Sequence, residues 1–307
     1  MKLIVQKYGG TSVADASAIK KAASKVIEAK EEGNSVVVVV SAMGSRTDDL
    51  INLAVELTDD PEPREMDMLL STGERETMSL MAMYLKNQGY DAISLTGSQA
   101  GIITTSKHGQ AEIEEITGDR VREGLDKGQV VIVAGFQGFN RDTREITTLG
   151  RGGSDATAVA LAASLDADVC EIYTDVRGVF TSDPRIVNKA KLIKEITYDE
   201  MLEMSSSGAK VLMARSVEFG RRYNVPIKVS STFLDEEGTI VKDKVMEQAI
   251  ISGVTHNDEE IKFTLFGVPD QPGIAAKVFK PLSEVGVNVD MIVQNVSKEN
   301  KSDISFT

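Results

Sequence analysis

The stretch LIVQKY (residues 3–8) and the stretch VVVVVSA (36–42) are short runs rich in β-branched residues, separated by a segment of helical length and period, Ala16–Glu32. Their apolar residues are continuous and do not alternate with polar ones, which is typical of parallel strands covered on both faces. Four further runs also look like buried strands: DAISL (91–95), QVVIVAGF (129–136), DVCEIYT (168–174) and VPIKVSS (225–231). Helical patterns lie between them, at Glu65–Gln88, Ser154–Leu165 and Gly208–Tyr223. The alternation predicts an α/β fold, a three-layer αβα sandwich around a mainly parallel central sheet.

Composition narrows the function classes. The 307 residues carry a formal net charge of −13, a field that repels nucleic-acid phosphates and anionic lipid headgroups. A single cysteine, Cys170, forms no internal disulfide, and two histidines, His108 and His256, are too few for Cys/His zinc patterns. The first residues contain no apolar core of a signal peptide, and no run approaches the length of a membrane span. We therefore expect a cytoplasmic protein that binds neither nucleic acid nor membrane.

The order of strand-like and helix-like runs changes after residue 245. Three strand-like runs, AIISGVT (249–255), KFTLFGV (262–268) and VNVDMIVQNV (287–296), surround one helix-like stretch, Gly273–Glu284. The final residues SDISFT have the pattern of another strand, so this smaller α+β module is expected to be incomplete. The predicted division is a domain over residues 1–245 and a partial domain over 246–307.

The end of the first strand carries the first candidate site. Lys7 is followed by Gly9 and Gly10 and then by two hydroxyl residues. Paired glycines let backbone N–H groups approach an anion, and the lysine supplies positive charge, so the segment predicts a phosphate site. The alternative is an ordinary strand-to-helix turn with an exposed lysine. The order of residues is not that of a P-loop.

A second glycine-rich segment, LGRGGSD (149–155), precedes the helical stretch ATAVALAAS. Ser154 or Asp155 is placed to cap that helix, and Arg151 with Asp155 would put an anion clamp and a carboxylate on one rim. The alternative is a flexible loop with an ordinary cap. Two further features predict a nucleotide site only in combination with the two glycine-rich segments. They are the segment TDVRGVFTSDPR (174–185) and Lys210, at the predicted start of the last helix.

Six segments together resemble, in order and spacing, the signatures of the aspartokinases of the amino acid kinase family. They are KYGGTSV (7–13), SAMGSRTDDL (41–50), STGERE (71–76), LGRGGSDATA (149–158), TDVRGVFTSDPR (174–185) and SSGAKVL (206–212). The tail is similar to the first ACT repeat of the same enzymes, an amino-acid-sensing module. The resemblance implies a kinase that phosphorylates the side-chain carboxylate of L-aspartate from MgATP, giving 4-phospho-L-aspartate, the first step toward lysine, threonine and methionine.

The resemblance also implies residue roles. Lys7 stabilises the transferring phosphoryl group, and Asp155 organises the catalytic lysines. Phosphate oxygens are held by Gly9, Gly10 and Ser41. L-Aspartate is held by Thr47, Glu74 and Arg151, with Glu74 facing its α-ammonium. The residues implied for the nucleotide side are Thr174, Asp175, Phe180, Arg185 and Lys210, and those implied for an effector are Asp270, Gly273, Ala275 and Gln294. ATP and Mg²⁺ are the expected cofactors, with no protein metal ligand named.

Elementary chemistry agrees with a carboxylate acceptor. A carboxyl group with an ordinary pKa near 3.9 is ionised at pH 7, so the acceptor needs no general base. Two rival functions stay open at this point: an amino acid kinase acting on glutamate or N-acetylglutamate, which STGERE and the ACT-like tail argue against, and a noncatalytic ACT sensor, which would lack the amino-terminal segments. We expect a homo-oligomer, with lysine or threonine as an effector if the regulatory part is completed.

Overall fold

The computed structural model describes residues 1–245, 251–257, 261–287, 289, 291–295 and 300–307. These residues form two compact units, Met1–Thr255 and His256–Thr307. The boundary expected from the sequence, after residue 245, lies before this division. No helix in the described part of the chain is long and apolar enough to cross a membrane.

The first unit is built on an eight-stranded sheet with the order β10-β12-β11-β9-β1-β2-β6-β3. Its neighbouring strands are parallel except for the β11–β12 pair. The strands are β1 (Leu3–Tyr8), β2 (Ser35–Val40), β3 (Ala92–Leu95), β6 (Val130–Ala134), β9 (Val169–Thr174), β10 (Glu195–Thr197), β11 (Ile227–Ser231) and β12 (Thr239–Lys242). All six predicted strands of this region are confirmed, and β10 and β12 extend one edge.

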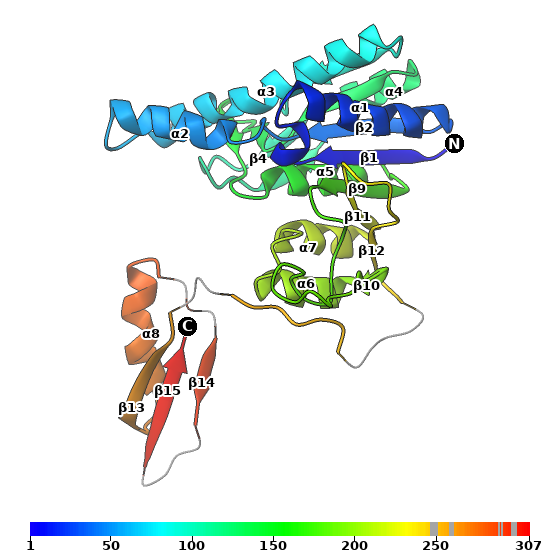
Figure 1. Ribbon diagram of the computed structural model, residues 1–307. Helices are drawn as coiled ribbons and strands as arrows, with labels where there is room; N and C mark the ends of the chain where they lie inside the picture. The colour runs from blue at the N-terminus through cyan, green and yellow to red at the C-terminus, as the bar shows by residue number, and fades with distance from the viewer. Residues whose placement is uncertain (246–250, 258–260, 288, 290, 296–299) are drawn as a thin grey trace. The chain divides into compact units, whose positions relative to one another are not determined.

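Helices cover both faces of this sheet (Figure 1). The first face carries α1 (Ala16–Glu31) and α3 (Pro63–Asn87), and the second carries α4 (Asp119–Asp126) and α5 (Gly153–Ser164). The five valines of β2 show why: Val37 and Val39 belong to the core on the α5 side, while Val36, Val38 and Val40 belong to the core under α1 and α3. A strand with two buried faces has to be apolar at every position. The predicted three-layer α/β fold is confirmed.

The first unit has further elements. They are the 3₁₀ turn η1 (Gly10–Val13) and the helices α2 (Arg46–Leu57), α6 (Tyr198–Ser206) and α7 (Ala214–Tyr223). Of these, α6 and α7 pack on the same side as α5. A second sheet has the order β5-β4-β7-β8 and consists of β4 (Ile102–Thr104), β5 (Ile113–Ile116), β7 (Gln137–Phe139) and β8 (Ile146–Thr148). The predicted helix over 208–223 is wrong at its start, because residues 208–213 form turns before α7, and Lys210 therefore lies in a turn.

The second unit is a three-stranded antiparallel sheet, in the order β13-β15-β14, with one helix. Its elements are β13 (Phe263–Pro269), α8 (Ile274–Glu284), β14 (Ile292–Gln294) and β15 (Lys301–Phe306). SDISFT is indeed strand, paired with both neighbours. The strand predicted over 249–255 is wrong for residues 251–255, which are irregular, and residues 249 and 250 lie outside the described residues.

Candidate functional site

Lys7 and Asp155 meet where the end of β1 faces the start of α5. Lys7 has the same parity in β1 as Val5, whose side chain is packed in the core on the α5 side. Its Nζ lies 2.6 Å from Asp155 Oδ1, and each side chain is only 11% exposed. A buried charge requires a partner, which explains why the lysine and the carboxylate are paired across 148 residues of sequence.

The prediction that Ser154 or Asp155 caps α5 is wrong. The helix begins at Gly153 with Gly152 as the N-cap, and no described side chain caps it. Ser154 and Asp155 therefore lie inside the first turn. The uncapped N–H groups at this end favour an anion beside Lys7.

Gly10 makes room for the loop that follows β2. A Cβ on Gly10 would lie 3.0 Å from the Gly44 carbonyl oxygen and 3.1 Å from that of Ala42. The Gly44 N–H donates to the Gly10 carbonyl at 3.0 Å, and the Ser41 N–H donates to the Tyr8 carbonyl at 3.0 Å. The turns after β1 and β2 are thus joined backbone to backbone, as glycine at this position allows.

Glu74 is a buried carboxylate of the site whose pKa is shifted upward. It lies on α3, is 3% exposed, and accepts a hydrogen bond from the Ala42 N–H at 3.1 Å through Oε1. Its other oxygen, Oε2, has no hydrogen-bond partner among the described residues. Burial raises the pKa of the Glu74 carboxyl to about 7. An unsatisfied buried oxygen that lines a cleft is suited to a donor supplied by a ligand.

A cleft of about 1170 Å³ connects these groups. Seven of the predicted site residues line it: Lys7, Gly10, Ser41, Thr47, Glu74, Arg151 and Asp155. They come from the ends of β1 and β2, from α2 and α3, and from the turn into α5. The cleft wall therefore contains a buried cation, Lys7, and a buried hydrogen-bond acceptor, Glu74.

The residues predicted for the nucleotide side are not among the described residues that line this cleft. Thr174 ends β9 and its hydroxyl donates to Asp175 at 3.0 Å, while the Gly9 N–H donates to the preceding Tyr173 carbonyl at 3.3 Å. Phe180 forms an isolated bridge with Leu192. Arg185 is exposed and pairs with Asp183 at 2.7 Å. Thr174 is thus the last residue of β9, Asp175, Phe180 and Arg185 follow that strand, and Lys210 lies in the turn before α7.

Several cleft residues carry no prediction from the sequence. Asp67 and His108 form one wall, and Phe136 and Met213 lie near the turn into α5. Asp67 precedes Glu74 by two helical turns on the same helix, so the i, i+7 spacing is a signal that could have found it. His108 lies in a polar loop, whose sequence has no such pattern. Among the described residues, no group of three or more acidic, histidine or cysteine side chains could hold a metal ion.

Comparison with known proteins shows which family the chain belongs to. The amino acid kinase family matches residues 2–231 and the ACT domain matches residues 263–307. The aspartokinase of Mycolicibacterium smegmatis is 57% identical, over all of this chain and 74% of its own length. An aspartate kinase structure from Synechocystis is 46% identical with a TM-score of 0.72, over 99% of this chain and 52% of that one.

Aspartokinase III of E. coli has been solved in two complexes. With aspartate and ADP it is 26% identical to this chain, with a TM-score of 0.79, over 99% of this chain and 78% of that one. With lysine and aspartate the TM-score is 0.80, at the same identity, over 99% and 79%. The catalytic and ACT-like parts of this chain thus occur together, in the same order, in enzymes of one activity. The chain belongs to the amino acid kinase family and, within it, to the aspartokinases.

Proposed function

We propose that the cleft between Lys7 and Glu74 is where this aspartate kinase transfers the γ-phosphoryl group of ATP to the side-chain carboxylate of L-aspartate, giving 4-phospho-L-aspartate. The product begins the synthesis of the aspartate-derived amino acids. The observation that carries the assignment is the buried Glu74 Oε2, an acceptor without a described partner in the wall of the cleft. A substrate ammonium would satisfy it.

The aspartate side combines one acceptor with one cation. Glu74 would bind the α-ammonium, and Arg151, in the turn before α5, would bind a carboxylate, with Thr47 beside them. An amino acid with a second carboxylate then presents that group toward Lys7. Recognition by opposite charges at separate points fixes orientation as well as affinity.

The phosphoryl side relies on positioning and charge. Lys7 Nζ is held by Asp155, so the ammonium is fixed where negative charge develops on the transferring group. The backbone near Gly9 and Gly10, together with Ser41, would bind phosphate oxygens, and Thr174, Asp175, Phe180, Arg185 and Lys210 would border the nucleotide. The acceptor carboxylate is already ionised, so no residue has to remove a proton.

Mg²⁺ would accompany ATP. The described residues offer no cluster of three acidic or histidine ligands, and Asp155 is already paired with Lys7. This donor set fits a Mg²⁺ ion carried chiefly by the phosphates and water, where it would neutralise charge on the β- and γ-oxygens.

The second unit would supply regulation. Asp270, Gly273, Ala275 and Gln294 are exposed in it, and we propose that they bind lysine or threonine when another ACT unit faces them. A homo-oligomer would provide one route to such a pairing.

The test compares L-aspartate with succinate, which lacks the α-ammonium. The wild type should use L-aspartate far better than succinate, and Glu74→Ala should raise the KM for aspartate at least about tenfold while leaving the KM for ATP nearly unchanged. Glu76→Ala, an exposed glutamate on the same helix that pairs with Arg46, is the matched control. Equal effects of Glu74→Ala on both KM values would contradict the assignment.

A further inference from the structure

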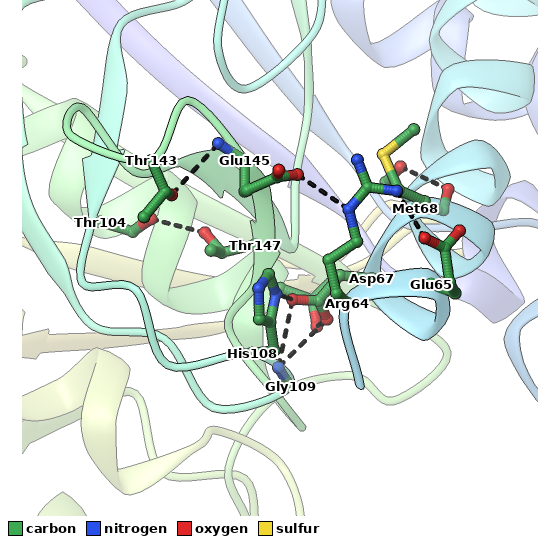
Figure 2. Close-up of polar contacts among 12 residues, drawn as sticks. Arg64, Glu65, Asp67, Met68, Thr104, His108, Gly109, Thr143, Glu145 and Thr147 are labelled. Carbon is green, nitrogen blue, oxygen red and sulfur yellow. Dashed lines mark hydrogen bonds and ion pairs between the residues drawn. The ribbon is translucent and has the colours of Figure 1, made fainter. Parts of the chain in front are cut away.

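The Asp67 carboxylate is the centre of a polar cluster in the cleft wall (Figure 2). The side chain is 1% exposed, yet it has three hydrogen-bonded neighbours. His108 Nδ1 lies 2.7 Å from Oδ2, the Gly109 N–H donates to Oδ1 at 3.1 Å and to Oδ2 at 3.2 Å, and the Thr148 hydroxyl donates to Oδ1 at 2.5 Å. A carboxylate has room for all three neighbours, because its two oxygens offer about four acceptor positions.

These contacts join three separate walls of the cleft. Asp67 lies on α3, two helical turns before Glu74, so the two carboxylates move together with the helix. Thr148 ends β8 and leads through Leu149 into the turn that carries Arg151. His108 and Gly109 belong to the loop between β4 and β5, which also lines the cleft.

From this arrangement we propose that Asp67 is a positioning residue: through Thr148 and His108 it fixes Glu74 and Arg151, and thereby the distance from the bound backbone end of the substrate to Lys7, which selects the length of the dicarboxylic amino acid that the cleft accepts. The inference rests on the proposed function of the cleft. Glu74 and Arg151 would bind the backbone end of the substrate, so a shift of one relative to the other displaces the reacting carboxylate from Lys7. A displacement of about 1 Å is enough to lower a rate substantially.

The polar pair Arg64–Glu145 provides a matched comparison in the same view (Figure 2). It links α3 to the hairpin of β7 and β8, with Arg64 Nε 2.9 Å from Glu145 Oε2. The two side chains are 37% and 34% exposed, and neither belongs to the described lining of the cleft. Breaking this link should leave substrate selection unchanged, because partly exposed ion pairs contribute little.

The experiment compares Asp67→Asn, Thr148→Val and His108→Asn with the control Arg64→Gln, measuring kcat and KM for L-aspartate, L-glutamate and ATP. For the first two variants we expect a rise of about tenfold or more in the KM for aspartate and a similar loss of preference for aspartate over glutamate, with the KM for ATP within about twofold of wild type. His108→Asn should shift the same quantities by less. Thr148→Ser, which keeps the hydroxyl, should restore them, and Arg64→Gln should match the wild type.

A lower melting temperature without a change in the aspartate-to-glutamate preference would overturn the proposal, and so would equal changes in the KM for aspartate and for ATP. If Asp67→Asn does not fold, Thr148→Val and His108→Asn decide the matter alone. Glu74→Ala separates the two levels of inference. If it leaves the KM for aspartate unchanged, the proposed function fails; if it raises that KM while the Asp67 cluster variants do not, only the positioning role fails.

Discussion

Glu74 is a residue whose buried charge lowers the stability of the fold, although the same carboxylate is proposed to bind the substrate. Its carboxyl is buried, with one oxygen lacking a described partner, and burial raises its pKa from 4.5 to about 7. A raised acid pKa means that the folded protein holds the proton more tightly than the unfolded chain. The associated stability is complete below about pH 4.5 and is lost as pH rises through 7. The rise corresponds to about 3 kcal/mol.

Glu74→Gln should therefore stabilise the protein at pH 8 and change little at pH 4.5. We expect a gain in the free energy of unfolding of up to about 3 kcal/mol at pH 8, because Gln carries no charge that burial can destabilise. Urea unfolding of both proteins at the two pH values measures the difference. A mutant that is less stable than wild type at pH 8 would show that the buried carboxylate has a stabilising partner.

Lys7→Ala should lower kcat by about a hundredfold or more, because it removes a fixed charge that acts on the transition state. Since Lys7 and Asp155 act as a pair, the double variant Lys7→Ala/Asp155→Ala should be little slower than the single one. Circular dichroism checks the fold, and Lys25→Ala, whose lysine pairs with Asp235 at the surface, is the control. Near-normal turnover of Lys7→Ala would refute the role of this lysine.

Sequence reasoning reaches some of these residues and misses others for identifiable reasons. The glycines after Lys7 and before Asp155 mark anion sites locally, and family resemblance pairs the two segments. The environment of Glu74 depends on how closely α3 approaches Ala42, which residue types along one helix do not reveal. The contact of Asp67 with His108 and Thr148 joins positions 41 and 81 residues apart, with no local signal at His108.

Among the elements, the strands with two buried faces were the easiest to predict. The five valines of β2 form a continuous apolar run, which indicates a strand buried on both faces, and they pack into the cores on both sides of the sheet. The second sheet was missed because β4, β7 and β8 each have three residues, too few for a period to show. The start of α7 was missed because residues 208–213 include good helix formers, while the chain turns there before Ala214.

Gly73 tests how the position of α3 depends on one close contact. A Cβ at this position would lie 2.7 Å from the Ala42 Cβ. Alanine usually stabilises a helix interior by about 0.5–1 kcal/mol relative to glycine, but overpacking costs about 1–3 kcal/mol. We expect Gly73→Ala to lower the free energy of unfolding by about 1 kcal/mol and to raise the KM for aspartate, because α3 has to move away from Ala42.

The control for this variant is Thr72→Ala, an exposed position on the same helix. Urea unfolding and aspartate kinetics of both variants provide the comparison. Gly73→Ala with wild-type or higher stability would mean that the contact between α3 and Ala42 relaxes without cost.

At the scale of the whole molecule, the second unit presents an incompletely covered surface. Phe266 is 78% exposed and Val293 is 50% exposed, and no residue of the described helix α8 is buried. Apolar side chains exposed together on a small sheet favour association with another element or another copy. An effector site that requires a second ACT unit would stay open in such a module.

We therefore expect lysine and threonine to inhibit a monomer of these 307 residues little, with rates within about twofold of the uninhibited value, because a ligand shifts an equilibrium only through differential binding. An assembly in which a second ACT unit faces this one should be inhibited. Titration of both amino acids against the kinase rate measures the effect. Strong inhibition of the monomer would mean that one ACT unit is enough to form the effector site.

The proposed reaction in the cleft between Lys7 and Glu74 is phosphorylation of the side-chain carboxylate of L-aspartate. An acyl phosphate reacts with hydroxylamine, so the most direct measurement incubates the protein with MgATP, L-aspartate and hydroxylamine and quantifies ADP and aspartyl hydroxamate together. We expect hydroxamate in equal amount to ADP. Its formation should depend on aspartate, be at least about a hundredfold slower in Lys7→Ala, and be much lower with L-glutamate or succinate. Formation of ADP without hydroxamate, or equal hydroxamate from wild type and Lys7→Ala, would contradict it.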